Sequence, residues 1–316
     1  MIVILNRAAG TASGEADESA NKVRELFAAR GTEVRILHPD EQRDLSAVAR
    51  DAAAEDVAVI VAGGGDGTIS AVAGALADTN KVLGVLPLGT LNHFAKDLGI
   101  PLDLADAVET IVAGHIAEVD AAEVNGRIFI NNSSLGIYPE IVANREAQQE
   151  HFARGKWTAF VWAALRAFRR FPFLHLKITL EGKELERRTA FLFIGNNEYE
   201  IAGFNLGGRA CMNAGKLGLY LSHRTGRLGL LRLAFHALLG RLNQEKDFDS
   251  YCVEEATIEA RSPRLLVATD GEVSEVETPL CYRIRPRALR VLIPQTERNG
   301  DTPVAATRRD RSVASP

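Results

Sequence analysis

The sequence predicts an α/β domain at the N-terminus and a mostly antiparallel β-domain after it. Up to about residue 117, continuous apolar runs alternate with amphipathic stretches, which is typical of a parallel sheet with helices on both faces. Beyond that point strand patterns follow one another, beginning with a hairpin signal at Asn125 and Gly126. We therefore expect domains at residues 1–117 and 118–295, and a polar, unpatterned and disordered tail at 296–316.

The periodicity of apolar residues places the elements of both halves. Strands are expected at 2–6, 33–38, 57–62 and 82–87, and helices at 15–30, 45–54, 69–77 and 103–113. The second half has strand patterns at 174–180, 189–195, 217–222, 256–261, 265–269, 281–286 and 289–294, interrupted by helical patterns near 156–171 and 226–243. Right-handed crossovers should bring the loops after the first-half strands to one edge of the sheet.

The composition limits the class of protein. The 316 residues carry a formal net charge of -4, so no overall field attracts the chain to nucleic acid. No stretch approaches the roughly 20 uncharged apolar residues of a membrane span, and the first residues lack a signal-peptide pattern. The three cysteines show no CxxC spacing and are expected to be buried free thiols in a reducing compartment. The sequence thus predicts a cytoplasmic protein with no transmembrane segment and no nucleic-acid partner.

The strand at 57–62 runs directly into the sequence GGGDGT, residues 63–68. Glycines between a strand and a helix let the backbone approach a ligand, and the positive end of the helix dipole favours phosphate. The sequence matches neither GxxxxGK[ST] nor GxGxxG. Asp66 would repel a phosphate unless Mg²⁺ lies between them. The alternative is a tight turn in which Asp66 and Thr68 only cap the helix.

Two neighbouring strand ends have a similar composition. Residues 86–101, LPLGTLNHFAKDLGIP, turn at Pro87 and Gly89 and offer Thr90 and Asn92 for hydrogen bonding. Asn6 ends the first strand. Three polar or glycine-rich loops at one sheet edge are what a nucleotide crevice in an open α/β sheet requires.

GGGDGT followed by LPLGTLNHFA resembles the bacterial diacylglycerol kinase and sphingosine kinase family of lipid kinases, which is related in fold to NAD kinases. The resemblance extends over about residues 1–294 through NRAAG at 6–10, VDAAEVNGRIFINNSSLGIYPEIV at 119–142, GNNEY at 195–199 and ATDGEV at 268–273. It implies an N-terminal nucleotide-binding α/β domain and a C-terminal β-sandwich, with ATP and lipid meeting in the cleft between them.

The resemblance also implies roles for single residues. Asp66 would face Mg²⁺, and Asp270 or Glu272 would take the proton of a lipid hydroxyl, which is a poor nucleophile near neutral pH. Taken alone, the TDGE sequence would be a surface turn between strands. Asp120 matches a further acid of a metal-linked network, or is a solvated strand-end acid. The implied nucleotide-binding residues are Asn6, Gly63, Gly64, Gly65, Asp66, Gly67, Thr68, Gly89, Thr90 and Asn92.

The chain departs from the family pattern at four places. Arg7 replaces a proline of the first loop, and HPDEQRDLS at 38–46 lacks a Thr-x-x-x-Gly element that contacts the nucleotide. His93 replaces an acid, which weakens an Asp-based magnesium network. Ala214 stands where the acid of a second, structural Mg²⁺ site is expected, so that second site is doubtful.

Three functions stay open. An ATP-dependent lipid kinase acting on a diacylglycerol- or sphingoid-like lipid is favoured. An NAD kinase shares GGDGT, and a catalytically weak lipid-binding regulatory protein would fit the missing nucleotide element. The stretches 154–171 and 226–243 mix basic with apolar residues, so they either lie on an anionic membrane surface or are ordinary packing helices. The sequence identifies neither the lipid nor the oligomeric state, and a homodimer is one alternative.

Overall fold

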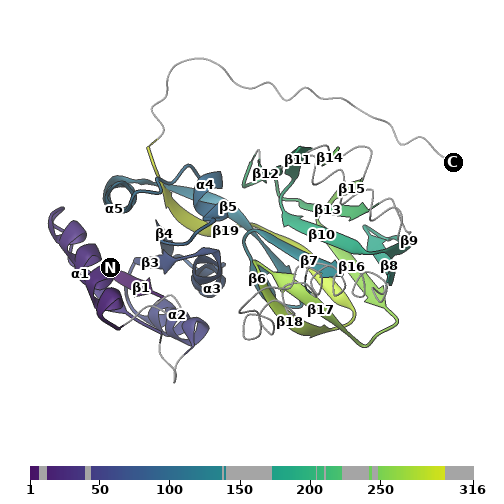
Figure 1. The fold of residues 1–316 in the computed structure, drawn as a ribbon, viewed down its shortest axis with the longest axis horizontal. Coiled ribbons are helices and arrows are strands. Elements are labelled where there is room, and N and C mark those ends of the chain that lie inside the picture. The colour runs from purple at the N-terminus through teal and green to yellow at the C-terminus, as the bar shows by residue number, and fades with distance from the viewer. Residues whose placement is uncertain are drawn as a thin grey trace, which may run out of the picture.

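The structure is a computed structural model that describes residues 1–6, 13–39, 44–136, 139, 173–203, 205–209, 211–222, 242–243 and 248–295. Its ribbon shows a helix-covered N-terminal half and a β-rich second half, connected by the strands β5 (His115–Val124) and β19 (Leu280–Ile293) (Figure 1). The predicted tail at 296–316, the stretch 154–171, residues 226–241, Arg7 and residues 40–43 of the 38–46 segment lie outside the described residues.

Four parallel strands form the sheet of the first half, in the order β2-β1-β3-β4. They are β1 (Ile2–Leu5), β2 (Arg35–Leu37), β3 (Val59–Gly64) and β4 (Val82–Pro87). Because strand side chains alternate, Ile2 and Ile4 pack under α2 (Leu45–Ala54) and α3 (Asp66–Leu76). Val3 and Leu5 pack under α1 (Ser13–Ala28) and α5 (Leu104–Ala113) on the opposite face. The predicted parallel sheet with helices on both faces is confirmed.

The second half is a sandwich of two largely antiparallel sheets. The first-half sheet continues through β4-β19-β16-β8-β9, with β5 paired to β19 and β6 paired to β5. The facing sheet has the order β15-β13-β10-β7-β17-β18. One apolar core lies between them. The bounds are β6 (Arg127–Phe129), β7 (Asn132–Gly136), β8 (Leu174–Leu180), β9 (Lys183–Thr189), β10 (Phe191–Asn196), β13 (Leu217–Ser222), β15 (Phe248–Val253), β16 (Glu255–Ala260), β17 (Arg264–Thr269) and β18 (Glu272–Glu277). A small sheet of β11 (Tyr199–Gly203), β12 (Asn205–Arg209) and β14 (Leu242–Asn243) completes it.

Several elements differ from the sequence predictions. The two strands expected at 281–286 and 289–294 are one strand, β19, whose register with β5 shifts between Arg285 and Leu289. Pro286 lies in this irregular segment and has no N–H to donate to the ladder. Residues 242–243 form β14 at the end of a stretch expected to be helical. The strands β7, β9, β11, β12, β15 and β18 and the short helix α4 (His93–Asp97) were not predicted.

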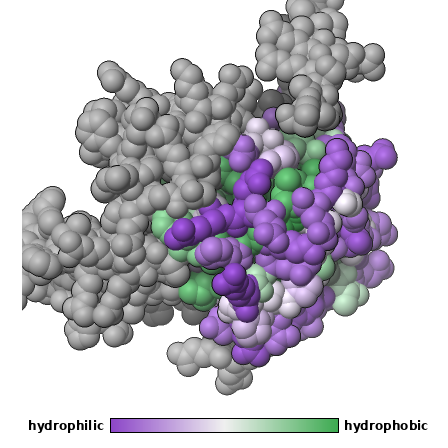
Figure 2. Space-filling view, turned by 90° about the vertical axis from the view of Figure 1, so that its right-hand side faces the viewer, coloured by the Kyte–Doolittle hydropathy of each residue, from purple (hydrophilic) through white to green (hydrophobic). Residues whose placement is uncertain are grey.

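The surface of the second half carries mainly charged side chains at the end formed by β8 and β9. Figure 2 shows that hydrophilic residues dominate this end, with apolar patches between them. Within the described part of the chain, no helix has the length and apolar character needed to cross a bilayer. The three cysteines are free, as expected, but they are exposed rather than buried.

Candidate active site

The turn between β3 and α3 carries the glycine-rich sequence and leaves the start of α3 uncapped. β3 ends at Gly64, and Gly65 is the N-cap residue of α3, with φ -84° and ψ -176°. Gly65 has no side chain to cap the helix, and within the described residues no other side chain accepts a hydrogen bond from its first N–H groups. Uncapped N–H groups at a helix N-terminus, together with the positive end of the helix dipole, favour an anion.

The positions of this turn need glycine for two different reasons. A Cβ on Gly63 would lie 2.2 Å from Leu5 Cδ2, and one on Gly64 would lie 2.4 Å from Thr68 Oγ1, so both are required by packing inside the protein. A Cβ on Gly65 or Gly67 would meet nothing closer than 3.5 Å. Only these last two glycines keep backbone open toward a ligand, a distinction that the sequence does not reveal.

The loop after β4 packs against the glycine turn. A Cβ on Gly89 would lie 2.4 Å from Gly65 Cα, so the two backbones touch. Asn92 has φ 51° and closes its own loop: its Nδ2 donates to Gly89 O at 2.8 Å and to Pro87 O at 3.2 Å, and its Oδ1 accepts from Gly89 N at 3.0 Å. Thr90 is exposed. Asn92 therefore shapes the site from within the protein.

The first strand end joins the same edge. Asn6 Nδ2 donates to Thr68 Oγ1 at 3.0 Å, and Asn6 N donates to Gly63 O at 3.0 Å. Asp66, the acid of the glycine turn, accepts a hydrogen bond at Oδ1 from the Phe94 N–H at the start of α4, at 3.2 Å. His93 is exposed beside it. The three strand-end loops thus meet at one edge, as the sequence predicts.

Asp270 lies in the turn between β17 and β18, with φ 49°. Its Oδ1 accepts from the N–H groups of Asn131 and Asn132, at 2.8 and 3.0 Å. Its Oδ2 accepts from Ile130 N at 2.8 Å and from Ser70 Oγ on α3 at 2.5 Å. Burial raises the pKa of Asp270 above its ordinary value, while these four hydrogen bonds act in the opposite direction. The second half thereby places a carboxylate directly against the helix that follows the glycine turn.

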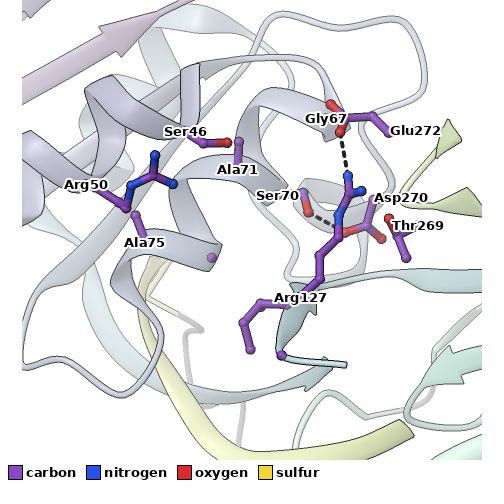
Figure 3. Close-up of a pocket in the computed structure, with 13 residues that line it drawn as sticks. Ser46, Arg50, Gly67, Ser70, Ala71, Ala75, Arg127, Thr269, Asp270 and Glu272 are labelled. Atoms are coloured by element: carbon purple, nitrogen blue, oxygen red, sulfur yellow. Dashed lines mark hydrogen bonds and ion pairs between the residues drawn. The ribbon is translucent and has the colours of Figure 1, made fainter. Parts of the chain in front are cut away.

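Glu272 is the more exposed of the two predicted acids, with 61% of its side chain accessible. Its Oε2 accepts from Arg127 Nη2 at 2.8 Å, and its Oε1 lies 3.5 Å from the position of a Cβ on Gly67. Figure 3 shows Glu272 and Arg127 at the mouth of a cavity, with Ser70 and Asp270 joined beside them. Glu272 belongs to the same site but faces solvent.

The cavity beside Asp270 has a volume of about 210 Å³. Its walls come from α2 and α3 in the first half and from β6, β17 and β18 in the second. Thr269, 3% exposed, lines it with a hydroxyl that has no hydrogen-bond partner within the described residues. The cavity is therefore formed by both halves, where the sequence predicts a substrate cleft.

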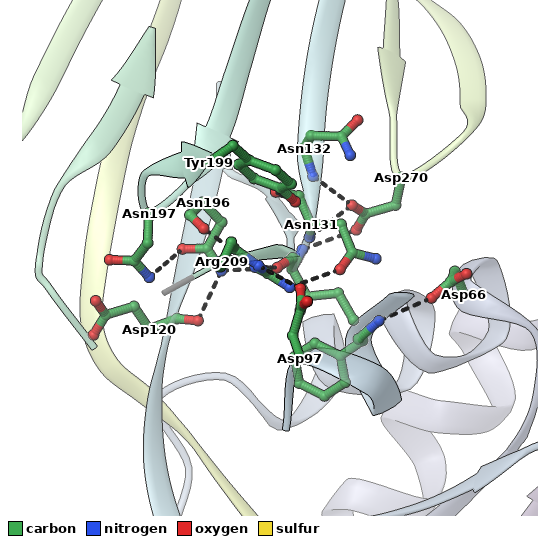
Figure 4. A network of polar contacts seen from close by, with 12 residues as sticks. Asp66, Asp97, Asp120, Asn131, Asn132, Asn196, Asn197, Tyr199, Arg209 and Asp270 are labelled. Carbon is green, nitrogen blue, oxygen red and sulfur yellow. Dashed lines mark hydrogen bonds and ion pairs between the residues drawn. The ribbon is translucent and has the colours of Figure 1, made fainter. Parts of the chain in front are cut away.

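A buried arginine connects α4 to the donors of Asp270 (Figure 4). The Arg209 side chain is fully buried: its Nε donates to Asp97 Oδ2 of α4 at 2.8 Å and its Nη2 to Asn131 Oδ1 at 2.9 Å. Its Nη1 donates to the carbonyl oxygens of Ile130 and Asn196, at 2.6 and 3.1 Å. This network fixes the segment whose N–H groups hold Asp270.

Asp120 is completely buried and accepts two backbone hydrogen bonds. Its Oδ2 accepts from Gly215 N at 2.7 Å and its Oδ1 from Arg287 N at 2.8 Å, next to the irregular segment of β19. Asn197 Oδ1 accepts from Ala214 N at 3.0 Å in the same turn. The contacts of Asp120 are those of a residue that fixes strand geometry.

The site residues expected from sequence fall into one region, but the residues that connect them were missed. Ser70 has the pattern of an ordinary helix residue, and Arg209 lies in no motif. Thr269 stands in the TDGE sequence and Arg127 in the 119–142 segment, but neither was assigned a role. The position of Ser70 one helix turn after Gly67 is the only signal in the sequence that could have revealed it.

Comparison with known proteins gives two family matches that together cover most of the chain. Residues 1–124 match the diacylglycerol kinase catalytic domain, and residues 135–293 match the YegS C-terminal NAD kinase beta sandwich-like domain. A relative from Yersinia pestis (strain Pestoides F), called "Probable lipid kinase YegS-like", is 33% identical over 171 residues. That match covers 52% of this chain and 55% of the relative, so the chain spans about half the length of the curated relatives it matches.

Solved structures agree with the fold. A Bacillus anthracis str. Sterne protein, described as "a putative diacylglycerol kinase", is 26% identical with a TM-score of 0.70, over 93% of this chain and 97% of the other. Yeast NADH kinase in complex with NADH has a TM-score of 0.52 at 11% identity, over 93% of this chain and 83% of the other, a likeness of fold alone. The chain belongs to the family that combines a diacylglycerol kinase catalytic domain with a YegS C-terminal NAD kinase beta sandwich-like domain.

Proposed function

We propose that the protein is an ATP-dependent lipid kinase that transfers the γ-phosphoryl group of ATP to a hydroxyl of a diacylglycerol- or sphingoid-like lipid. The observation that carries the proposal is Asp270, a carboxylate of the second half held against α3 of the first half, beside a cavity formed by both. Phosphoryl transfer needs the two substrates in line and a group that takes the acceptor proton. A cavity between a phosphate-binding turn and a carboxylate meets both needs.

The residues of the glycine turn fit a nucleotide phosphate. The start of α3 is uncapped, and Gly65 and Gly67 leave the backbone open there. We propose that Asn6, Thr68, Gly89 and Asn92 hold this turn in shape, with Gly63 and Gly64 required by packing, and that Thr90 contacts the nucleotide from the exposed side.

The residues near the turn fit Mg²⁺ as a companion of the nucleotide. Within the described residues there is no group of three or more acids, histidines or cysteines that could hold a metal. Asp66 keeps one carboxylate oxygen after accepting from Phe94 N. Because Mg²⁺ commonly binds one or two carboxylates, substrate phosphates and water, Asp66 would supply the one protein ligand. Bound there, the metal would offset negative charge on the phosphates.

Of the two predicted acids, we propose Asp270 as the proton acceptor. Its hydrogen bonds fix its position, and its raised pKa makes it a stronger base than an exposed carboxylate. Glu272 is paired with Arg127 on the solvent side of the site, and we propose that this pair shapes the mouth of the cavity. We expect the lipid to reach the cavity from a membrane surface.

A radiolabelled-ATP assay tests the proposal. The protein is incubated with an extracted lipid mixture and, separately, with NAD. We expect label in lipid, and loss of that label in Asp270→Asn. Label in NADP instead would support an NAD kinase, which the fold shared with yeast NADH kinase permits. Lipid binding without transfer would support a regulatory protein.

A further inference from the structure

Ser70 lies between the cavity and the carboxylate of Asp270. Its Oγ donates to Asp270 Oδ2 at 2.5 Å, and Ser70 is one of the residues that line the cavity (Figure 3). Ile130 N donates to the same oxygen, and two further N–H groups donate to Oδ1. A carboxylate offers about four lone-pair positions. All four are already used, so a substrate hydroxyl has no direct hydrogen bond to make with Asp270.

We propose that Ser70 is a catalytic residue that receives the proton of the acceptor hydroxyl while passing its own proton to Asp270. This inference rests on the proposed phosphoryl transfer and changes which side chain contacts the acceptor. A serine hydroxyl has one proton to give and lone pairs to accept another. Ser70 is half-buried on α3, so its oxygen is available from the cavity while its proton points to Asp270.

The step balances without any further reactant. The acceptor proton moves to Ser70 Oγ as the Ser70 proton moves to Asp270 Oδ2, which leaves Ser70 unchanged and Asp270 neutral. The acceptor oxygen forms its bond to the γ-phosphorus, and the bond from that phosphorus to the bridging oxygen breaks. ADP leaves with the electron pair of that bond. Asp270 afterwards releases its proton to water.

A second observation supports a polar ligand in this cavity. Thr269 lines the cavity, and its buried hydroxyl has no partner within the described residues, which is unfavourable unless a ligand hydrogen-bonds to it. A second oxygen of the acceptor, such as an ester carbonyl or another hydroxyl, would satisfy it. Space for such a headgroup comes from the small residues on one face of α3: Gly67, Ser70, Ala71, Gly74 and Ala75.

The competing explanation is that Ser70 only holds Asp270 in place. In that case Ser70→Ala frees a lone pair on Oδ2 for the substrate, and activity is kept or rises. The two explanations therefore predict opposite results for one substitution. Ser19 provides the matched control, because it is an exposed serine of α1, the helix on the opposite face of the first-half sheet, and is not among the residues that line the cavity.

The test measures kcat and KM with ATP and diacylglycerol in mixed micelles for Ser70→Ala, Ser70→Thr and Ser19→Ala. We expect Ser70→Ala to lower kcat by about 100-fold with KM nearly unchanged, since acid–base catalysis contributes roughly 10²–10⁴-fold. Ser70→Thr keeps a hydroxyl and should recover most of the rate, and Ser19→Ala should match the wild type. An Ala variant at position 70 with wild-type or higher kcat would overturn the relay.

Single-turnover rates in H₂O–D₂O mixtures give an independent measurement. Two protons moving in one step should give a curved dependence on the deuterium fraction, and a direct transfer to Asp270 a linear one. A linear plot for the wild type would contradict the relay while leaving the kinase function intact. If the wild type phosphorylates NAD and no lipid, the proposed lipid acceptor is wrong, and the same Ser70 comparison on NAD still decides the relay.

Discussion

Replacing Arg209 by methionine should destabilise the protein far more than removing any exposed cation. The Arg209 side chain is fully buried and donates to Asp97, Ile130, Asn131 and Asn196. The substitution leaves the Asp97 carboxylate, 12% exposed, without its cation. Removing one partner of a buried ion pair typically costs about 3–5 kcal/mol of unfolding free energy. At roughly 2–4 °C per kcal/mol for chains of 150–250 residues, Tm should fall by about 10 °C.

Differential scanning fluorimetry measures this shift, with Arg264→Met as the matched control. Arg264 pairs with Glu277 at 3.0 Å, but the two side chains are 61% and 77% exposed. Such surface pairs contribute about 0–1 kcal/mol, so the control should move Tm by less than about 3 °C. Combining Arg209→Met with Asp97→Leu should recover part of the loss, because the unpaired carboxylate is removed as well. Equal Tm values for the Arg209 and Arg264 variants would refute the reasoning.

Three further outcomes follow from the site. Gly64→Ala should lower Tm, because the added Cβ would lie 2.4 Å from Thr68 Oγ1. Gly65→Ala should keep Tm nearly unchanged but weaken ATP binding, which calorimetry measures. Glu272→Gln should keep kcat within a few-fold, while Asp270→Asn should lower it at least about 100-fold; equal losses would mean that both acids act. A plot of kcat against pH should rise through the raised pKa of Asp270, because only the deprotonated carboxylate accepts a proton. The folded state binds more protons than the unfolded state between the ordinary and the raised pKa, so the Asp270 contribution to stability falls as pH rises through that window.

The fold was predictable where the sequence pattern reflects burial. VLGVLP is buried along its whole length and VIVAGG at every residue but its first, which gives the strong signal of central parallel strands. Two of the missed strands, β9 and β18, with the sequences KELERRT and EVSEVE, are each at the end of a sheet. An edge strand needs few apolar residues and often carries charge, so its sequence resembles a loop. α4, with five residues, is too short to show a helical period.

The candidate site was predictable in its parts and not in its connections. Glycine-rich turns and acids are visible as local motifs, so the nucleotide side and the TDGE sequence could be found. The donors to Asp270 come from positions 138, 139, 140 and 200 residues away in the chain. No spacing rule relates residues at such separations, because their contact depends on the path of the whole sheet. Ser70 and Arg209 could therefore be recognised only in three dimensions.

The position of Asp270 relative to the glycine turn depends on the sheet rather than on a loose interface between two domains. β19 pairs with β4 of the first half and with β5 and β16 of the second, so one sheet runs through both. Asp120 holds the irregular segment of β19 through Arg287 N. The helix α3 has the glycine turn at its start, and one turn later it carries Ser70, which donates to Asp270. Because α3 contacts both the glycine turn and Asp270, the distance between that turn and the Asp270 carboxylate is set before any substrate binds. The proposed transfer between two held substrates requires such a fixed distance.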